Sequence, residues 1–194
     1  MGDVAPLPGW YDDLDGFERA CWRAMARGSA DRRSPFHTPV LANVAADGRP
    51  EARTLVLRGV DEAARTLRFH SDLRAAKVAA LRLRPDVSVL FYDKTAKLQV
   101  RARGLARVET VTDDVGASAW DQTRSFSRKC YRTEPTPGSA IAFGDHYGQP
   151  DRDDEGAEAF GVIIISVKET EALFLASQGH RRARFGHERT WLVP

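Results

Sequence analysis

The sequence has only two cysteines among its 194 residues, Cys21 and Cys130, and they lie far apart. Two widely spaced cysteines do not make a disulfide framework, and neither lies in a CxxC pair of the kind found in zinc and redox sites. The five histidines also lack the HxxxH spacing with which one helix face binds a metal. The sequence therefore predicts neither a disulfide nor a metal site.

Long hydrophobic runs are also missing. The longest, from Phe160 to Ile165, falls far short of the roughly 20 residues that cross a bilayer. The first sixteen residues have neither the basic region nor the apolar core of a signal peptide. We therefore expect no membrane span and place the protein in a reducing cytoplasm.

Several nucleotide-binding and hydrolase motifs are absent. There is no Walker A motif, no GxGxxG after a strand and no GxSxG, which argues against a nucleotide-fold dehydrogenase. An excess of positive charge is lacking too, because 29 basic residues face 27 acidic ones. A dedicated nucleic-acid binder has a clearly basic domain. A barrel that binds single strands also has several aromatic side chains on which bases stack, and in this sequence Phe69 is the one candidate. We therefore predict no nucleic-acid partner.

What is present describes an ordinary globular domain, with 42% hydrophobic and 29% charged residues. We predict a single domain over residues 1–194. Its ends are an N-terminal arm, residues 1–13, that lies across the surface or a partner, and a long loop at about 133–158 with an acidic run at 151–155. A loop of that length is a lid, an interface arm or disordered.

The periodicity predicts a mainly β fold with peripheral helices, arranged as a barrel or closed sheet. Helices are expected from Leu14 to Gly28, over 75–83 and from Asp113 onwards, with a further turn at 128–132. An Asp47-Gly48 hairpin is expected to join strand 38–45 to strand 52–57, with strand 66–69 extending that hairpin. Further strands are expected over 87–92, buried on both faces, and over 98–108 with a bulge at Gly104, then over 162–167, 172–175 and 180–185.

The segment from Arg53 to Lys77 predicts a phosphate site. A strand ends at Ser71-Asp72, a helix follows, and Ser71 or Asp72 is a plausible N-cap, so the first helical N–H groups and Lys77 would favour an anion. Arg53 and Arg58 add guanidiniums, which bind phosphate oxygens in pairs. Against this, arginines flanking a strand are often solvated, and two residues five apart on a regular strand face opposite sides. A shared ligand would need a bulge or a position at the rim of the strand.

Gln99 is a lone amide in an apolar strand. It either faces solvent or donates and accepts hydrogen bonds to a planar heterocycle.

Together these motifs resemble one family. Arg53-x4-Arg58, Phe69-His70-Ser71-Asp72 with Lys77, Pro85-x-Val87-x-Val89-Leu90-Phe91-Tyr92, Gln99-Val100-x3-Gly104, and Arg184-Phe185 with the terminal Leu192-Val193-Pro194 are similar to those of the pyridoxamine 5'-phosphate oxidases and their relatives. The resemblance covers Val40 to Val108 and the last fifteen residues. It implies an FMN-binding split β-barrel, a homodimer with FMN at the interface, and oxidoreductase activity.

The resemblance also implies site residues. Those expected to bind FMN are Arg53, Thr54, Leu55, Arg58, His70, Ser71, Lys77, Gln99 and Arg184. Arg53, Ser71 and Lys77 would hold the phosphate, Gln99 would meet the polar edge of the flavin, and Arg184 would close the site.

The departures from the family bear on the substrate. One phosphate-binding arginine is replaced by Ala76, and a flavin-side tryptophan by Leu175. The candidate substrate-binding residues are Arg124, Arg128, His180 and Arg182, which suit a small anionic substrate. No catalytic residue is assigned. The alternative is a flavin-binding sensor without turnover, in which the 133–158 loop binds a partner.

Overall fold

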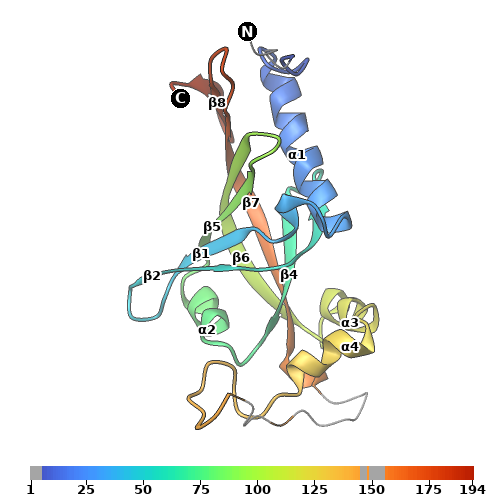
Figure 1. The fold of residues 1–194 in the computed structure, drawn as a ribbon. Coiled ribbons are helices and arrows are strands. Elements are labelled where there is room, and N and C mark those ends of the chain that lie inside the picture. Colours follow the sequence, from blue (N-terminus) through green and yellow to red (C-terminus); the bar gives the residue numbers. More distant parts are fainter. Residues whose placement is uncertain (1–5, 145–147, 149–155) are drawn as a thin grey trace.

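The computed structural model describes residues 6–144, 148 and 156–194 of the chain (Figure 1). The helices are α1 (Leu14–Ala30), α2 (Ala76–Leu83), α3 (Asp114–Asp121) and α4 (Ser125–Arg128), with short 3-10 turns at η1 (Pro35–His37), η2 (Lys129–Tyr131) and η3 (Ala157–Ala159). The strands are β1 (Val40–Val44), β2 (Pro50–Thr54), β3 (Leu57–Asp61), β4 (Thr66–Asp72), β5 (Asp86–Asp93), β6 (Leu98–Thr110), β7 (Phe160–Phe174), β8 (Arg181–Phe185) and β9 (Arg189–Leu192).

Within the described residues nine strands form one antiparallel sheet, in the order β2-β1-β5-β6-β7-β4-β3, with β8 paired to β7 and β9 to β8. The two strands at the ends of this order, β2 and β3, are joined by two residues, Leu55 and Val56. The three steps from Thr54 to Leu57 reach only about 10 Å, so the two edges lie close together and the sheet curls. The expectation of a mainly β, barrel-like fold with peripheral helices is confirmed.

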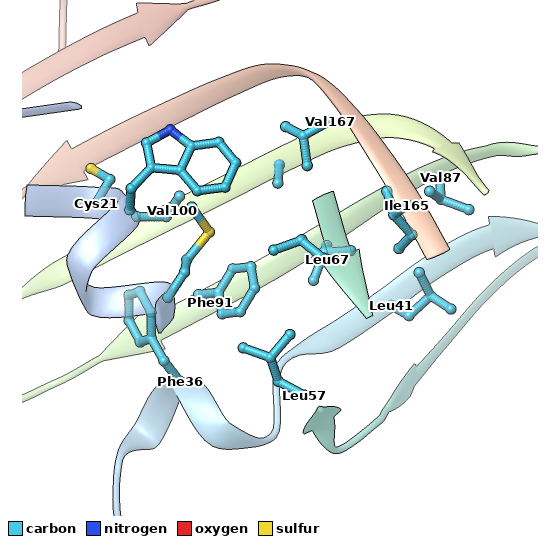
Figure 2. Packing of buried hydrophobic residues seen from close by; sticks show 14 of the residues in the cluster. Cys21, Phe36, Leu41, Leu57, Leu67, Val87, Phe91, Val100, Ile165 and Val167 are labelled. Carbon is cyan, nitrogen blue, oxygen red and sulfur yellow. The ribbon is translucent and has the colours of Figure 1, made fainter. Parts of the chain in front are cut away.

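The core lies between α1 and the inner face of the curled sheet (Figure 2). Helix α1 contributes the apolar face expected from its periodicity, with Phe17, Cys21, Trp22 and Met25 all fully buried. These side chains pack against alternate residues of the strands, such as Leu41, Leu57, Leu67, Phe91, Val100 and Ile165. The sheet is therefore covered by α1 on one side, as an antiparallel sheet with one solvated face requires.

Two predicted strands differ from the observed ones. Residues 52–57 are not one strand, because the chain leaves β2 at Thr54 and begins β3 at Leu57. Strand β4 also does not extend the β1–β2 hairpin, since it pairs with β3 and β7. Arg53 and Arg58 therefore belong to strands at opposite ends of the sheet order, and the register shifts at Arg58, between Leu57 and Gly59. Because Arg53 and Arg58 are not on one regular strand, the rule that residues five apart face opposite sides does not apply to them.

Further differences concern β5 and β7. Strand β5 alternates instead of being buried on both faces: Val87, Val89 and Phe91 are buried, whereas Leu90 and Tyr92 are exposed. The two strands expected over 162–175 form the single 15-residue strand β7, because the polar residues between them continue to pair with β6. The Asp47-Gly48 hairpin and the bulge at Gly104 are confirmed.

The described part of the N-terminal arm packs onto the turn between β7 and β8. The Tyr11 hydroxyl donates to the Gly179 carbonyl over 2.6 Å, and the Arg181 guanidinium lies 3.9 Å from the centre of the Tyr11 ring. Trp10 stacks on Phe17 of α1. Tyr11 is thus buried rather than exposed. Residues 1–5, and residues 145–147 and 149–155 of the long loop with its acidic run, lie outside the described residues.

Candidate functional site

Lys77 lies in the first turn of α2, half-buried and close to Arg53 of β2. Burial lowers the pKa of Lys77, the neighbouring Arg53 guanidinium lowers it further, and Asp72 opposes both. Among the described residues no carboxylate lies within ion-pair distance of this ammonium. A half-buried cation beside a second cation is stabilised by a bound anion, so this corner of the fold suits a phosphate group.

Asn43 of β1 lies beside Arg53 in the same corner of the fold. Its side-chain oxygen accepts a hydrogen bond from Arg53, whose guanidinium also donates to Glu51 over 2.6 Å. The Asn43 side chain is 5% exposed, and its Nδ2 has no hydrogen-bond partner within the described part of the chain. Buried amide N–H groups are rarely left unpaired, so Nδ2 is a donor available to a ligand.

The turn between β4 and α2 differs from the expected cap. Strand β4 runs to Asp72, and the N-cap of α2 is Ala75, which has no side chain to cap the helix. Ser71 is buried, and its hydroxyl donates to the Asp72 carbonyl over 3.2 Å. Asp72 accepts two hydrogen bonds from the Arg74 guanidinium, at 3.0 and 2.7 Å. The predicted Ser71 or Asp72 cap is wrong. The first-turn N–H groups of α2 beside Lys77 consequently lack a side-chain cap.

A basic cavity of about 190 Å³ lies next to β4, between β3 and the α3–α4 segment. Four arginines and one histidine line it, Arg32, Arg58, Arg68, Arg124 and His70, together with the polar residues Gln122, Thr123 and Ser127 and with Ala119. Among the described residues no carboxylate lines it. Within the described residues none of the four guanidiniums has a hydrogen bond or an ion pair, although most other arginines of the chain have a carboxylate partner. The cavity is therefore suited to an anion.

His70 is held neutral in this cavity. Burial lowers its pKa to about 4, with further lowering by the Arg58 and Arg68 guanidiniums, and its ring packs edge-on against Phe160 at 4.9 Å between centroids. Near pH 7 the imidazole therefore offers one donor and one acceptor and no charge.

The depressed pKa of His70 predicts a pH-dependent stability. The unfolded chain, with an ordinary pKa near 6.5, binds a proton that the folded protein does not, so stability falls as pH drops from about 6.5 towards 4. Between pH 7 and pH 5 this amounts to about 2 kcal/mol. Urea unfolding of the wild type and of His70→Gln at both pH values measures it, and the variant should lose most of the difference. An equal pH dependence in both proteins would contradict this.

Of the candidate substrate residues, the structure places Arg124 in the cavity and Arg128 outside it. The Arg128 guanidinium donates to the carbonyls of Trp120 and Thr123, at 2.8 and 2.9 Å, and lies over the Trp120 ring at 4.5 Å. Arg128 therefore links α4 to α3 by hydrogen bonds. Arg58 and His70, which were expected on the flavin side, line the same cavity as Arg124.

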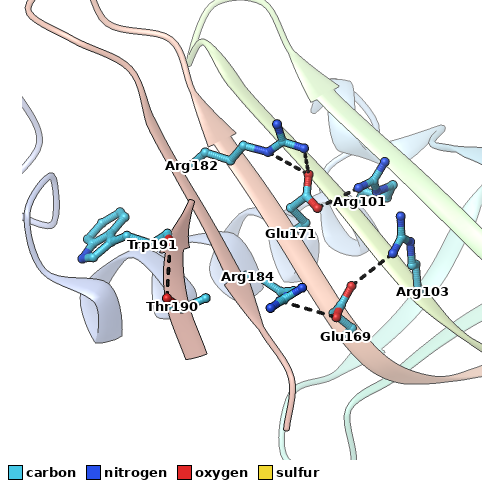
Figure 3. A network of polar contacts seen from close by, with 8 residues as sticks. All are labelled: Arg101, Arg103, Glu169, Glu171, Arg182, Arg184, Thr190 and Trp191. Atoms are coloured by element: carbon cyan, nitrogen blue, oxygen red, sulfur yellow. Dashed lines mark hydrogen bonds and ion pairs between the residues drawn. The ribbon is translucent and has the colours of Figure 1, made fainter. Parts of the chain in front are cut away.

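His180, Arg182 and Arg184 belong to the β8 region, at the opposite end of the molecule from α3 and α4 (Figure 1). Figure 3 shows Arg182 donating twice to Glu171 of β7, at 3.0 and 2.7 Å, while Arg101 of β6 holds the other oxygen of Glu171. Arg184 lies 3.9 Å from Glu169.

Gln99 sits nearby on β6, opposite Tyr92 of β5 and Leu173 of β7. Thr54 and Leu55 stand where β2 ends and the link to β3 begins. The structure therefore does not bring the β8 residues and Gln99 together with the basic cavity in one subunit.

Three residues of these sites escaped the sequence analysis: Asn43, Arg32 and Arg68. Asn43 carried the same signal as Gln99, an amide within an apolar strand. Arg68 is two positions from His70 and therefore shares its face of β4. Arg32 lies between α1 and η1, and nothing in its neighbourhood in the sequence marks it.

Comparisons with known proteins show what the chain is similar to. Residues 19–110 match the model of the FMN-binding domain of pyridoxamine 5'-phosphate oxidase. The pyridoxine/pyridoxamine 5'-phosphate oxidase of Hyphomonas neptunium is 31% identical over 136 residues, which cover 64% of this chain and 60% of that protein. The enzyme of the same name from Azotobacter vinelandii is 44% identical over 89 residues, covering 46% and 39%. Over these segments the chain resembles the pyridoxamine 5'-phosphate oxidase-like family.

Two solved structures share the fold along the whole chain. A pyridoxamine 5'-phosphate oxidase-related, FMN-binding protein of Nostoc punctiforme aligns with a TM-score of 0.73 at 22% identity, over 97% of this chain and 98% of its own. PhzG of Burkholderia lata, solved with tetrahydrophenazine-1-carboxylic acid, aligns with a TM-score of 0.72 at 20% identity, over all of both chains. The split-barrel fold is thereby established.

The matched segments span about 40 to 60% of the curated oxidases' length. The family includes oxidoreductases, and its model describes an FMN-binding domain. Among the described residues no helix has the length and apolar character needed to cross a membrane. No group of three or more histidine, cysteine or acidic side chains in the same part of the chain is placed to hold a metal.

Proposed function

We propose that this protein binds FMN and is an oxidoreductase that acts on a small anionic substrate. The observation that carries the proposal is a pair of cationic sites: the Lys77 corner, where the ammonium has no ion-pair partner within the described residues, and the basic cavity, which no described carboxylate lines. The first suits the phosphate of FMN and the second an anionic group of the substrate. Bound FMN would supply a flavin ring that accepts hydride from the substrate carbon.

The residues of the chain would bind and orient. Arg53 and Lys77 would contact the phosphate oxygens, Ser71 would face them from the end of β4, and Asn43 Nδ2 would donate a further hydrogen bond. Arg58, at the register shift of β3, lines the cavity and would help to orient the substrate. Arg124 would hold the substrate's anionic group.

The proposed site needs two copies of the chain. Arg184, Arg182, His180 and Gln99 lie far from the basic cavity of their own subunit, so a homodimer would supply them from the partner. Part of the solvent face of the sheet is apolar, with exposed Leu90 and Tyr92 on β5 and Leu105 on β6, and is suited to burial against a second copy. We propose the homodimer on these grounds. On the sequence composition we further propose that residues 1–194 form one domain and that the protein is cytoplasmic.

The first measurement is the colour of the purified protein. We expect absorption bands in the near ultraviolet and the blue, and release of FMN, identified by its mass, on denaturation. A colourless protein that takes up no added FMN would contradict cofactor binding.

A second measurement separates an enzyme from a flavin-binding sensor. An oxidoreductase should lose its blue absorption when a substrate from an anionic panel is added without oxygen, and should recover it in air. A protein that binds FMN but responds to no member of the panel would favour the sensor.

A further inference from the structure

A second cavity, of about 380 Å³, is built around the β3–β4 hairpin, and we call it the β3–β4 cavity. Its lining consists of Gly59, Val60, Asp61, Ala64, Thr66, Arg68, Arg107, Val115 and Ile164. It shares Arg68 with the basic cavity and no other lining residue. Pockets that enclose a small-molecule ligand measure roughly 300–1,000 Å³. The β3–β4 cavity therefore has room for one small molecule of its own.

Strand pairing sets the positions of the charged residues in this cavity. Arg68 of β4 pairs with Gly59 of β3 and with Ile164 of β7. Ile164 pairs in turn with Arg107 of β6. Residues paired in this way point to the same face of a sheet. Asp61 is two positions after Gly59, so it shares this face and lies diagonally across from Arg68, at about 7 to 8 Å.

The Arg68 guanidinium lies against Gly59. A Cβ added to Gly59 would come within 3.1 Å of the Arg68 Nε and 3.2 Å of its second terminal nitrogen, so the guanidinium occupies space that the glycine leaves. The Nε is buried and has no hydrogen-bond partner among the described residues. No carboxylate in the same part of the chain lies within ion-pair distance of this guanidinium. Its positive charge is therefore available to a ligand of the β3–β4 cavity.

Asp61 supplies the opposite charge. Its Oδ1 accepts a hydrogen bond from the Ala64 backbone N–H over 2.8 Å, which holds the carboxylate at the turn between β3 and β4. No cation in the described part of the chain forms an ion pair with it. Arg107, by contrast, already donates to Glu109 over 2.7 Å. Among the described lining residues, the charges left uncompensated are therefore those of Arg68 and Asp61.

The floor between and beside these charges is partly apolar. Ile164 is buried, and Val115 of α3 is 37% exposed. A ligand that fits would carry a carboxylate for Arg68 and an ammonium for Asp61. It would also carry an apolar group to cover Ile164 and Val115. An α-amino acid with an apolar side chain has all three, because its two charged groups and its side chain are attached to one carbon.

We propose that the β3–β4 cavity binds a free α-amino acid with an apolar side chain. Arg68 binds the carboxylate, Asp61 binds the ammonium, and the side chain lies over Ile164 and Val115. The site is separate from the Lys77 corner, and its occupancy does not depend on the proposed function.

Amide NMR titration of the isotope-labelled whole chain tests this, with L-leucine, isocaproate and isoamylamine as probes. Isocaproate is leucine without its ammonium, and isoamylamine is leucine without its carboxylate. We expect leucine to bind at least about tenfold more tightly than either of the other two, since each charged group adds a charge-assisted hydrogen bond. The amide signals of Gly59, Asp61 and Val115 should shift as leucine is added.

Asp61→Asn removes the negative charge and keeps an oxygen that can accept from the Ala64 N–H. Leucine should bind this variant about tenfold more weakly than the wild type, and no more tightly than isocaproate does. Because Asp61 does not line the basic cavity, this loss would also show that leucine does not bind there. Glu62→Gln is the matched control, a neighbouring exposed carboxylate outside the lining, and should bind leucine within about twofold of the wild type.

Arg68→Met should also weaken leucine binding by about tenfold, to the level of isoamylamine. Its control is Arg23→Met, which removes the same charge from an exposed position on α1. If Arg68→Met does not fold, Asp61→Asn still decides, because Asp61 is exposed. Leucine binding as tight in Asp61→Asn as in Glu62→Gln, or no tighter than that of isocaproate and isoamylamine in the wild type, would overturn the inference.

Discussion

Replacement of Lys77 by Met should weaken FMN binding by about 100-fold without destabilising the apoprotein. The ammonium is half-buried, lies close to Arg53 and has no carboxylate in ion-pair distance among the described residues. Loss of one partner from a desolvated charge pair costs a few kcal/mol of binding free energy. In the apoprotein the same ammonium is disfavoured by burial and by Arg53, so its removal should leave the melting temperature unchanged or raise it.

Fluorescence titration of the apoprotein with FMN, followed by thermal unfolding of the same samples, measures both effects. Arg82→Met is the matched control, because it removes a positive charge from an exposed position in the last turn of the same helix. We expect Arg82→Met to bind FMN within about threefold of the wild type. If Lys77→Met leaves the FMN affinity unchanged, the Lys77 corner does not hold the phosphate.

Gly104→Ala is expected to give the largest loss of stability among conservative substitutions in the sheet. An added Cβ would lie 2.1 Å from the Ser166 carbonyl oxygen and 3.0 Å from the Val167 Cα, both backbone atoms of β7. The two longest strands would have to separate at their bulge. Overpacking of this kind costs about 3 kcal/mol, which for a chain of this size lowers the melting temperature by about 6 to 12 °C.

Differential scanning calorimetry of Gly104→Ala beside Gly9→Ala tests this. A Cβ at Gly9 would meet nothing within 4 Å, so that variant should melt within about 1 °C of the wild type. A Gly104→Ala protein as stable as the wild type would mean that β6 and β7 can separate at the bulge without loss.

The elements that sequence periodicity predicted well are those with a single strong signal. Helix α1 carries apolar residues at helical spacing, the β1–β2 hairpin has an Asp-Gly turn, and Gly104 interrupts an alternating strand. Each of these features is determined by neighbours within a few residues. For these elements, the residues close by in the sequence were sufficient for the prediction.

The errors arose where long-range pairing decided the outcome. The apolar run at 54–57 looks like one strand, yet it is divided because Thr54 pairs with β1 while Leu57 pairs with β4. The interval at 168–171 looks like a turn, yet it remains extended because β6 pairs with it on one side and β8 on the other. Partners so distant in the chain leave no trace in a short window of sequence.

The same reason limited the prediction of the site. The proximity of Arg53 and Lys77 could be expected from local order along the chain, and the structure places them close together. The basic cavity could not, because Arg32, Arg58, Arg68 and Arg124 come from four segments whose meeting depends on the curl of the sheet. Family resemblance supplied Arg58 and Arg124 but neither Arg32 nor Arg68.

The two-residue link between β2 and β3 limits the distance between the two anion sites. Arg53 at one site and Arg58 at the other are five residues apart, so their Cα atoms are separated by at most about 17 Å. A longer link would allow a larger separation of the two sites. The length of the β2–β3 link therefore limits how far apart the cofactor phosphate and the anionic group of the substrate can be bound.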